Sequence, residues 1–140
     1  MIEDMIAGIA KRLREALPCR IYKNPVPQGL ERPCFLINPI LFTRVQQLGT
    51  RERRIYPFDV VYLPKTEERS EIYRVMNVLM RALRVIDTDF AGKLLGRDME
   101  CEIIDGVLHF RVRYDFSVCQ KQSTDDPMEI LDVKGELKHE

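Results

Sequence analysis

The chain has 140 residues, 45% of them hydrophobic and 31% charged, so it is long enough for one domain with a buried core and too apolar to be disordered. The 22 lysines and arginines equal the 22 aspartates and glutamates, which leaves no net charge to draw the protein to nucleic acid or to an anionic membrane. The apolar start, IEDMIAGIA, contains two acids and is too short for a signal peptide or a membrane span, so we expect a soluble protein made in the cytoplasm.

The first predicted element is an amphipathic helix over about residues 2–17. Apolar residues recur there at helical spacing, and Pro18 closes the segment. Residues 19–22 could then form a short strand, and the loop NPVPQGLER follows, in which two prolines and a glycine forbid regular structure.

Residues 33–63 are predicted to form a long hairpin. The segments 33–47 and 53–63 are rich in β-branched and aromatic residues and are separated by LGTRE. Pro39 and Pro57 cannot donate to a strand ladder, so each should face an edge or a bulge. Because both strands lack a polar alternate set, both of their faces need a cover.

A second amphipathic helix is predicted over about residues 68–86, with Thr66 or Ser70 as its cap. The two helices could cover one face of the sheet each. They could equally lie together on one face and leave the other to a neighbouring subunit, and this pattern favours self-association.

An Asp105-Gly106 turn predicts a second hairpin over about residues 98–119, because this dipeptide suits a type I′ turn. If Ile104 lies opposite Val107, one face becomes apolar and the other pairs acids with bases. The expected apolar pairs are Ile103 with Leu108, Cys101 with Phe110 and Met99 with Val112. The expected polar pairs are Glu102 with His109, Glu100 with Arg111 and Asp98 with Arg113.

These elements predict an α/β (α+β) fold, in which a mostly antiparallel or mixed sheet made of the two hairpins is covered by the two helices. Residues 1–120 should form a single globular domain. Residues 121–140 are polar, with one apolar island, and are either a docking arm or a frayed terminus. A docking arm would use Met128, Ile130, Leu131 and Val133.

No motif in the sequence indicates a catalytic, cofactor-binding or metal site. The chain has no P-loop, GxGxxG, GxSxG or HExxH motif, and its four cysteines include no CxxC pair. We therefore expect free thiols in a reducing compartment. His109 could pair with a cysteine, but it should point away from Cys101. Asp59 lies inside an apolar strand, where pairing with a nearby arginine or a backbone bulge at Pro57 is a simpler explanation than perturbed acid chemistry.

Arginines gather near the expected tip of the long hairpin, at Arg44, Arg51, Arg53 and Arg54. A basic finger of this kind could touch phosphates, or it could be a solvated tip that resists aggregation. No aromatic residue interleaves the tip closely enough to stack on bases, so sequence-specific recognition of nucleic acid is not expected.

Three sets of residues carry a further signal. They are Gln28-Gly29-Leu30 with Pro33-Cys34-Phe35; Tyr56-Pro57-Phe58-Asp59 with Tyr62 and Pro64; and Ile104-Asp105-Gly106-Val107-Leu108-His109-Phe110 with Tyr114-Asp115-Phe116. With these segments, and from the first helix to Met128 and Glu129, the chain resembles the tail-terminator family of long-tailed phages and prophages. The motifs are structural, so the resemblance carries over no catalytic residue.

The resemblance implies a virion structural protein of the phage tail. Such a protein forms a ring, usually a hexamer, on the head-proximal end of the tail tube, where it stops polymerisation and provides the surface for head-tail joining. Its partners would be further copies of itself, the tail tube protein and the head-tail connector protein, with no cofactor, membrane or sequence-specific nucleic acid. Subunit contacts are expected on Phe35, Ile37, Tyr56, Phe58 and Val60, and a lumen or tube contact on Arg51, Arg53 and Arg54.

Two other functions stay open. A head-tail connector or a tail-tube subunit would share the fold and the ring, and would differ in whether the purified protein makes closed rings or open tubes. A small hydrolase that uses His109 and a cysteine would need that pair within hydrogen-bond reach in a concave pocket.

Overall fold

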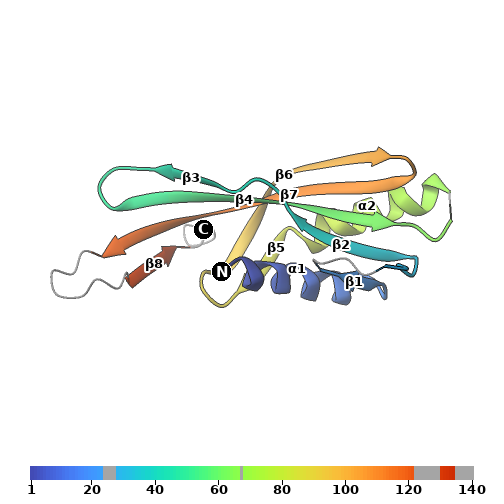
Figure 1. Ribbon diagram of the computed structural model, residues 1–140, viewed down its shortest axis with the longest axis horizontal. Coiled ribbons are helices and arrows are strands. Elements are labelled where there is room, and N and C mark those ends of the chain that lie inside the picture. Colours follow the sequence, from blue (N-terminus) through green and yellow to red (C-terminus); the bar gives the residue numbers. More distant parts are fainter. Residues whose placement is uncertain (24–27, 67, 122–129, 135–140) are drawn as a thin grey trace.

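The computed structural model describes residues 1–23, 28–66, 68–121 and 130–134. Two helices and eight strands form in these ranges, and Figure 1 shows an elongated molecule with β4 and β7 running along most of its length. The elements in chain order are α1 (Ile2–Ala16), β1 (Arg20–Tyr22), β2 (Cys34–Pro39), β3 (Thr43–Gln46), β4 (Arg51–Leu63), α2 (Arg69–Ala82), β5 (Val85–Thr88), β6 (Gly92–Ile104), β7 (Val107–Lys121) and β8 (Ile130–Lys134). No helix among the described residues is long and apolar enough to cross a membrane.

The strands form one mixed sheet in the order β1-β2-β4-β7-β6-β5, with β3 paired to β4 and β8 paired to β7. Only β1 and β2 run parallel; the other pairs are antiparallel. The predicted α+β class with a mixed sheet is therefore confirmed. The sheet also contains β5 and β8, which the two-hairpin prediction did not include.

The predicted long hairpin is interrupted on one side. Both β2 and β3 pair with β4, and residues 40–42 separate them. The Ile40 N–H donates to the Pro57 carbonyl at 3.0 Å. In an antiparallel ladder the N–H and C=O of one residue point to the same edge, so the missing N–H of Pro57 faces this gap. The break therefore lies where a proline would have left a regular ladder unsatisfied.

The Asp105-Gly106 hairpin has the predicted register near its turn. Glu100 faces Arg111, Cys101 faces Phe110, and the pairing continues in step to Ile104 with Val107. Beyond Glu100 the prediction is wrong, because a β-bulge places Arg97 opposite Arg113. Asp98 has a φ of 51° within this bulge. The Asp98 carboxylate still reaches Arg113, with Oδ2 2.7 Å from Nη1, so the ion pair forms without the predicted backbone register.

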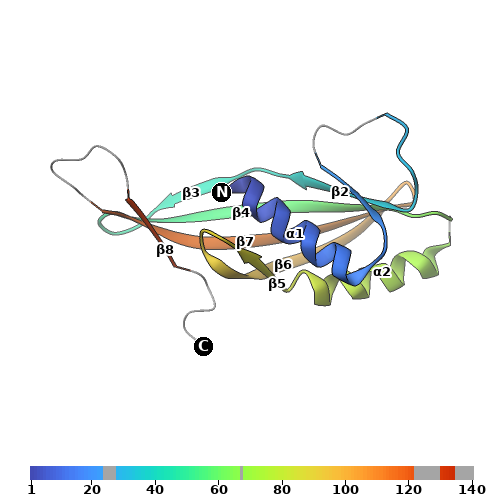
Figure 2. The same ribbon diagram turned by 90° about the horizontal axis from the view of Figure 1, so that it is seen from below.

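Both helices cover the same face of the sheet. Their apolar residues, among them Met5, Ile9, Ile72 and Leu79, join one core cluster with the even-numbered side chains at positions 56–62 of β4 and 108–118 of β7. Figure 1 places α1 below the sheet, and Figure 2, seen from below, shows α1 crossing β4 and β7 with α2 beside it. Of the two arrangements that the sequence allowed, the chain adopts the one that leaves the other face without a helix.

The second helix ends earlier than predicted. It stops at Ala82, and Ile86, which fits the helical spacing, lies instead in β5. Two contacts fix this end to the sheet: the buried Tyr114 hydroxyl donates to the Leu83 carbonyl at 2.7 Å, and the Gly96 N–H donates to the Arg84 carbonyl at 2.6 Å. A Cβ on Gly96 would lie 2.5 Å from the Leu83 carbonyl oxygen, so this close approach requires glycine.

Replacing Gly8 by alanine should lower the free energy of unfolding by about 1–3 kcal/mol, because overpacking against a backbone atom cannot relax easily. The added Cβ would lie 2.7 Å from the Asp87 carbonyl oxygen of β5. Helix propensity alone predicts the opposite sign, a gain of about 1 kcal/mol. Chemical denaturation measures the difference, with Ala7→Gly on the exposed side of α1 as the propensity control. A Gly8→Ala protein more stable than the wild type would contradict the close approach.

Replacing Tyr114 by phenylalanine should lower the free energy of unfolding by about 1–3 kcal/mol, because the buried Leu83 carbonyl would lose its partner. Tyr73→Phe removes a hydroxyl from a residue that is 49% exposed and should leave stability unchanged. Thermal unfolding of both variants tests this. Equal melting temperatures for the two would show that the Tyr114 bond does not hold the end of α2.

Candidate functional site

The face of the sheet opposite the helices carries most of the charged side chains that the strands hold in fixed positions. They come from odd positions of β4 and β7 and from even positions of β6 near the turn, which share this face by the strand register. We call it the outer face. It is the candidate functional surface because no helix of the described chain covers it.

Asp115 of β7 is the centre of an ion network on the outer face. Its side chain is fully buried, and its Oδ2 lies 2.6 Å from Nη2 of Arg53 in β4. Its Oδ1 lies 3.0 Å from Nε of Arg113, within ion-pair distance although not aligned as a hydrogen bond. Arg113 also binds Asp98 in the bulge of β6. The network thus joins three strands, and the buried carboxylate has two cations against it, as a buried charge requires.

Nearer the Asp105-Gly106 turn, Asp59 of β4 and His109 of β7 form a second pair. His109 Nδ1 and Asp59 Oδ2 are 2.9 Å apart, and both side chains are partly exposed. The expected partners were different: an arginine for Asp59 and Glu102 for His109. Glu102 instead accepts a bond of 3.1 Å from Arg111, because adjacent strands offer diagonal as well as direct neighbours.

The Asp59–His109 pair resembles the orienting half of a nucleophilic centre but has no thiol beside it. Cys101 faces Phe110, so its side chain is on the helix side of the sheet. Burial also raises the pKa of the Cys101 thiol, which lowers its thiolate fraction. All four cysteines are free. Among the described residues, no three histidine, cysteine, aspartate or glutamate side chains gather as metal ligands would.

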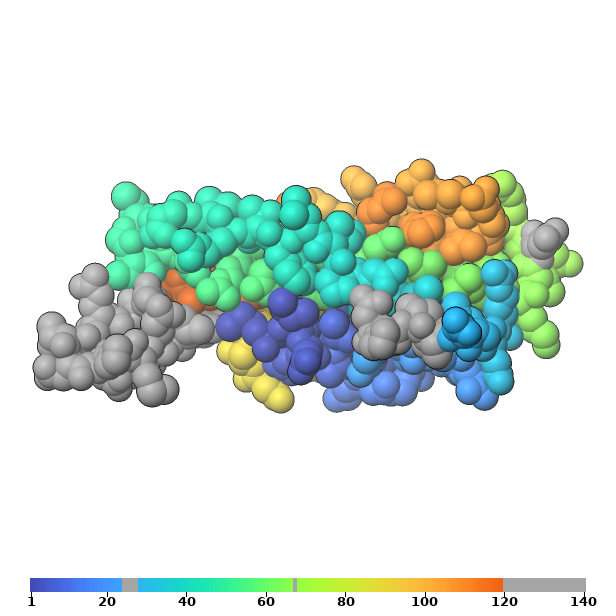
Figure 3. Space-filling view, in the orientation of Figure 1, coloured from blue at the N-terminus to red at the C-terminus, as the bar shows by residue number. Residues whose placement is uncertain are grey.

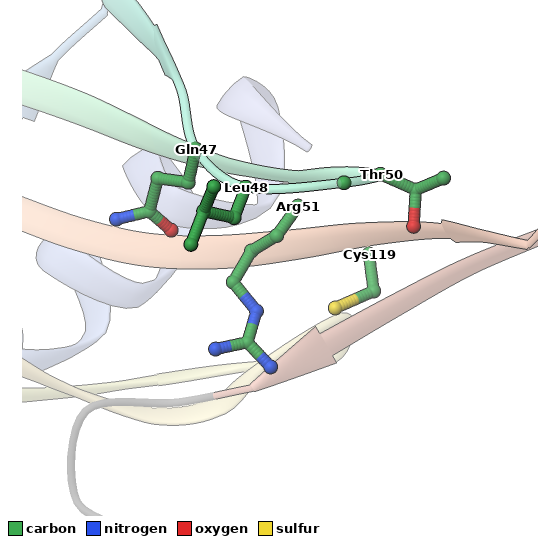
Figure 4. A pocket seen from close by; sticks show the side chains of 6 residues that line it. Gln47, Leu48, Thr50, Arg51 and Cys119 are labelled. Atoms are coloured by element: carbon green, nitrogen blue, oxygen red, sulfur yellow. The ribbon is translucent and has the colours of Figure 1, made fainter.

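Of the three arginines predicted for a lumen or tube contact, two are held in ion pairs and one is exposed. Arg53 is bound to Asp115, and Arg54 binds Glu52, with Nη2 2.8 Å from Oε1. Desolvation opposes the charge of Arg54, but its bonds to Glu52 and Tyr56 raise its pKa overall. Arg51 is exposed. It lines an open concavity at the hairpin tip with Gln47, Leu48, Gly49, Thr50 and Cys119 (Figure 4).

The residues predicted for subunit contacts lie in the core. Phe35, Ile37, Phe58 and Val60 are at most 1% exposed and Tyr56 is 8% exposed, all packed in the cluster under the helices. They were expected to lie on strands that are apolar on both faces and need a partner, but this chain's own helices cover them. A neighbouring copy could not contact them without displacing α1 or α2.

The predicted docking arm falls partly within the described residues. Ile130, Leu131 and Val133 belong to β8, whose backbone pairs with the end of β7 in the register Val118 with Val133. This segment therefore extends the chain's own sheet. Met128 lies outside the described residues.

The sequence did not identify Asp115 as a site residue. The signal was present in the odd positions of β7, where Arg111, Arg113 and Asp115 alternate with buried apolar residues. The second cation, Arg53, comes from β4, and only the long-range pairing of β4 with β7 brings it within reach.

Comparison with known proteins adds one finding. A family model described as "Phage tail terminator protein" matches residues 4–126, which is most of the chain. No curated protein matches the chain at a significant level.

Replacing Asp115 by asparagine should lower the free energy of unfolding by about 1.5–3 kcal/mol, because Arg53 and Arg113 would lose a charged partner that is buried between them. Asp98→Asn removes a carboxylate that also binds Arg113 but is 65% exposed, and it should cost less than about 1 kcal/mol. Urea denaturation at fixed salt compares the two. Similar losses for both variants would show that the network is no stronger than a surface ion pair.

Proposed function

The chain belongs to the phage tail terminator family, and from this premise we propose that it forms a ring on the end of the phage tail tube and ends tube growth there. The ring, which we expect to be a hexamer, also presents the surface to which the head connector binds. The protein is then a structural component of the virion tail, made in the cytoplasm of the host. The family match over residues 4–126 is the observation that carries this proposal.

The outer face gives the proposal a physical basis. Both helices lie on one side, so the network around Asp115 and the Asp59–His109 pair lie on the face that neither helix of the described chain covers. A rigid, charged face of this kind suits contacts with other proteins, since fixed charges set the register between partners and reject wrong ones. We therefore place the contacts with the tube, the connector and neighbouring copies on exposed surfaces rather than on the five core residues.

Termination follows if the contact between subunits closes on itself. A head-to-tail interface makes a ring when its rotation closes and a filament when it does not. One side of the ring would imitate a tube subunit and dock on the last ring of the tube. The other side would lack the surface that recruits the next tube ring, so growth stops.

Phage that lack this protein should make tails of irregular length that rarely join heads, since nothing would close the tube end. Electron microscopy of lysates measures tail length and the fraction of joined particles. The wild-type gene and a Cys101→Ser gene are used for complementation. Cys101→Ser removes a thiol that the hydrolase alternative could use, and this side chain is on the helix side of the sheet, away from the proposed contacts, so the variant should restore normal tails.

Tails of normal, uniform length joined to heads in the absence of the protein would contradict the terminator function. Loss of complementation by a folded Cys101→Ser protein would instead favour the hydrolase alternative. Open tubes formed by the purified protein would favour a tail-tube subunit.

A further inference from the structure

We propose that neighbouring copies of this chain contact each other head to tail, with the tip of the β3–β4 hairpin of one copy against the acidic edge of β6 in the next. The tip comprises residues 47–51, and the acidic edge comprises residues 98–105. This inference rests on the proposed ring and names the surfaces that would close it.

The tip is exposed, apolar at its end and positive. Leu48 is 95% exposed, more than any other large hydrophobic residue of the described chain. Arg51 is exposed and makes no ion pair with another described residue, while Arg44 beside the tip keeps a side-chain exposure of 66%. The nearby acid, Glu52, is only 15% exposed and is already bound by Arg44 and Arg54. An approaching partner therefore meets positive charge around one apolar side chain.

The edge of β6 has the complementary character. Residues 98–105, DMECEIID, contain four acids and no base. Two of these acids, Asp98 and Glu102, are bound by Arg113 and Arg111 of β7. Glu100 and Asp105 are exposed and make no ion pair within the described part of the chain, and Ile104 beside them is 40% exposed. The unpaired negative charge of this surface therefore comes from Glu100 and Asp105, on either side of the partly exposed Ile104. Asp105 shares a hollow with the basic residues Arg32, Lys65 and Arg69.

The β6 edge is also open along its backbone. Strand β5 pairs only with residues 92–95 of β6. Along residues 98–104, none of the described strands pairs with the edge of β6 that points away from β7. An unpaired edge strand is a ready site for contact with another chain. The strand β3 that leads to the tip is likewise paired on one side only, with β4.

The two surfaces lie at opposite ends of the molecule. Figure 1 shows the β3–β4 turn at one end of the long axis and the β6–β7 turn at the other, and Figure 3 shows both exposed on the same view of the surface. They cannot meet within one copy, so the contact must be between copies. A contact between two different surfaces is heterologous, which is the type that a ring requires.

Charge also argues against the competing symmetric contacts. Two tips would bring Arg51 and Arg44 of both copies together, and two β6 edges would do the same with Glu100 and Asp105. Like charges across an interface suppress wrong partners. The chain has no net charge, but part of its positive and negative charge is separated between the tip and the β6 edge. Of these contacts, only the head-to-tail one brings the two opposite charges together.

Two charge-reversed proteins test this pairing. The tip variant carries Thr50→Glu and Arg51→Glu, and the edge variant carries Glu100→Arg and Asp105→Asn. None of the ion pairs described above is touched, and asparagine tolerates the positive φ of 50° at residue 105. Arg14→Glu and Glu15→Arg on the exposed side of α1 are the controls, and circular dichroism with thermal unfolding verifies the fold of every protein.

Native mass spectrometry over a concentration series, with and without purified tube ends, measures assembly. The wild type and both controls should give one discrete oligomer, and each charge variant alone should need about tenfold more protein to form it. An equal mixture of tip and edge variants should restore assembly with an even number of copies, because each defective surface then meets its complement.

The contrary outcomes separate the inference from the ring itself. If the wild type forms a closed ring but both variants assemble equally well, or if the mixture fails to restore assembly, the tip-to-edge contact is wrong and the ring stands. If the tip variant assembles but no longer binds tube ends, the tip belongs to the tube contact and the inference is overturned. A wild type that never associates, even with tube ends present, would overturn the ring together with the inference.

Discussion

The alternation of side chains along β4 and β7 is the constraint on which the rest of the structure depends. The even-numbered residues between 56 and 62 in β4 and between 108 and 118 in β7 are buried under the helices, whereas odd-numbered residues hold the ion network around Asp115 and the Asp59–His109 pair. A slip of one residue between the strands would place charges in the core and aromatic rings on the surface. Register, core and outer face are therefore set together.

Part of the fold could be predicted from residues that are close together in the sequence. The Asp105-Gly106 turn determines the pairing of its neighbours, so the register from Glu100 to Ile104 follows from counting, and periodicity gives α1 nearly to the residue. What failed depends on contacts distant in sequence. The end of α2 is set by Tyr114 and Gly96, and His109 binds Asp59 because β4 lies beside β7. The five expected interface residues were assigned to a partner because the sequence does not say which face the helices cover.

The helices of the described chain cover one face of the sheet, and the other face is available for contacts between copies in the proposed ring. The helices bury the core within each copy, and the outer face and strand edges are the surfaces on which we propose assembly. The buried Asp115 holds β4, β6 and β7 in fixed relation through Arg53, Arg113 and Asp98. A stiff sheet transmits position from the hairpin tip at one end to the β6 edge at the other. Ring closure depends on that distance being constant, since a flexible subunit would also permit open chains.

An electron cryomicroscopy reconstruction of the tail end tests the central claim, closure of a capping ring, most directly. We expect a single closed layer of this protein on the tube, with the helices of each copy on its own sheet and the tip of each copy against β6 of the next. An open helical array, or several stacked layers of the protein, would contradict closure.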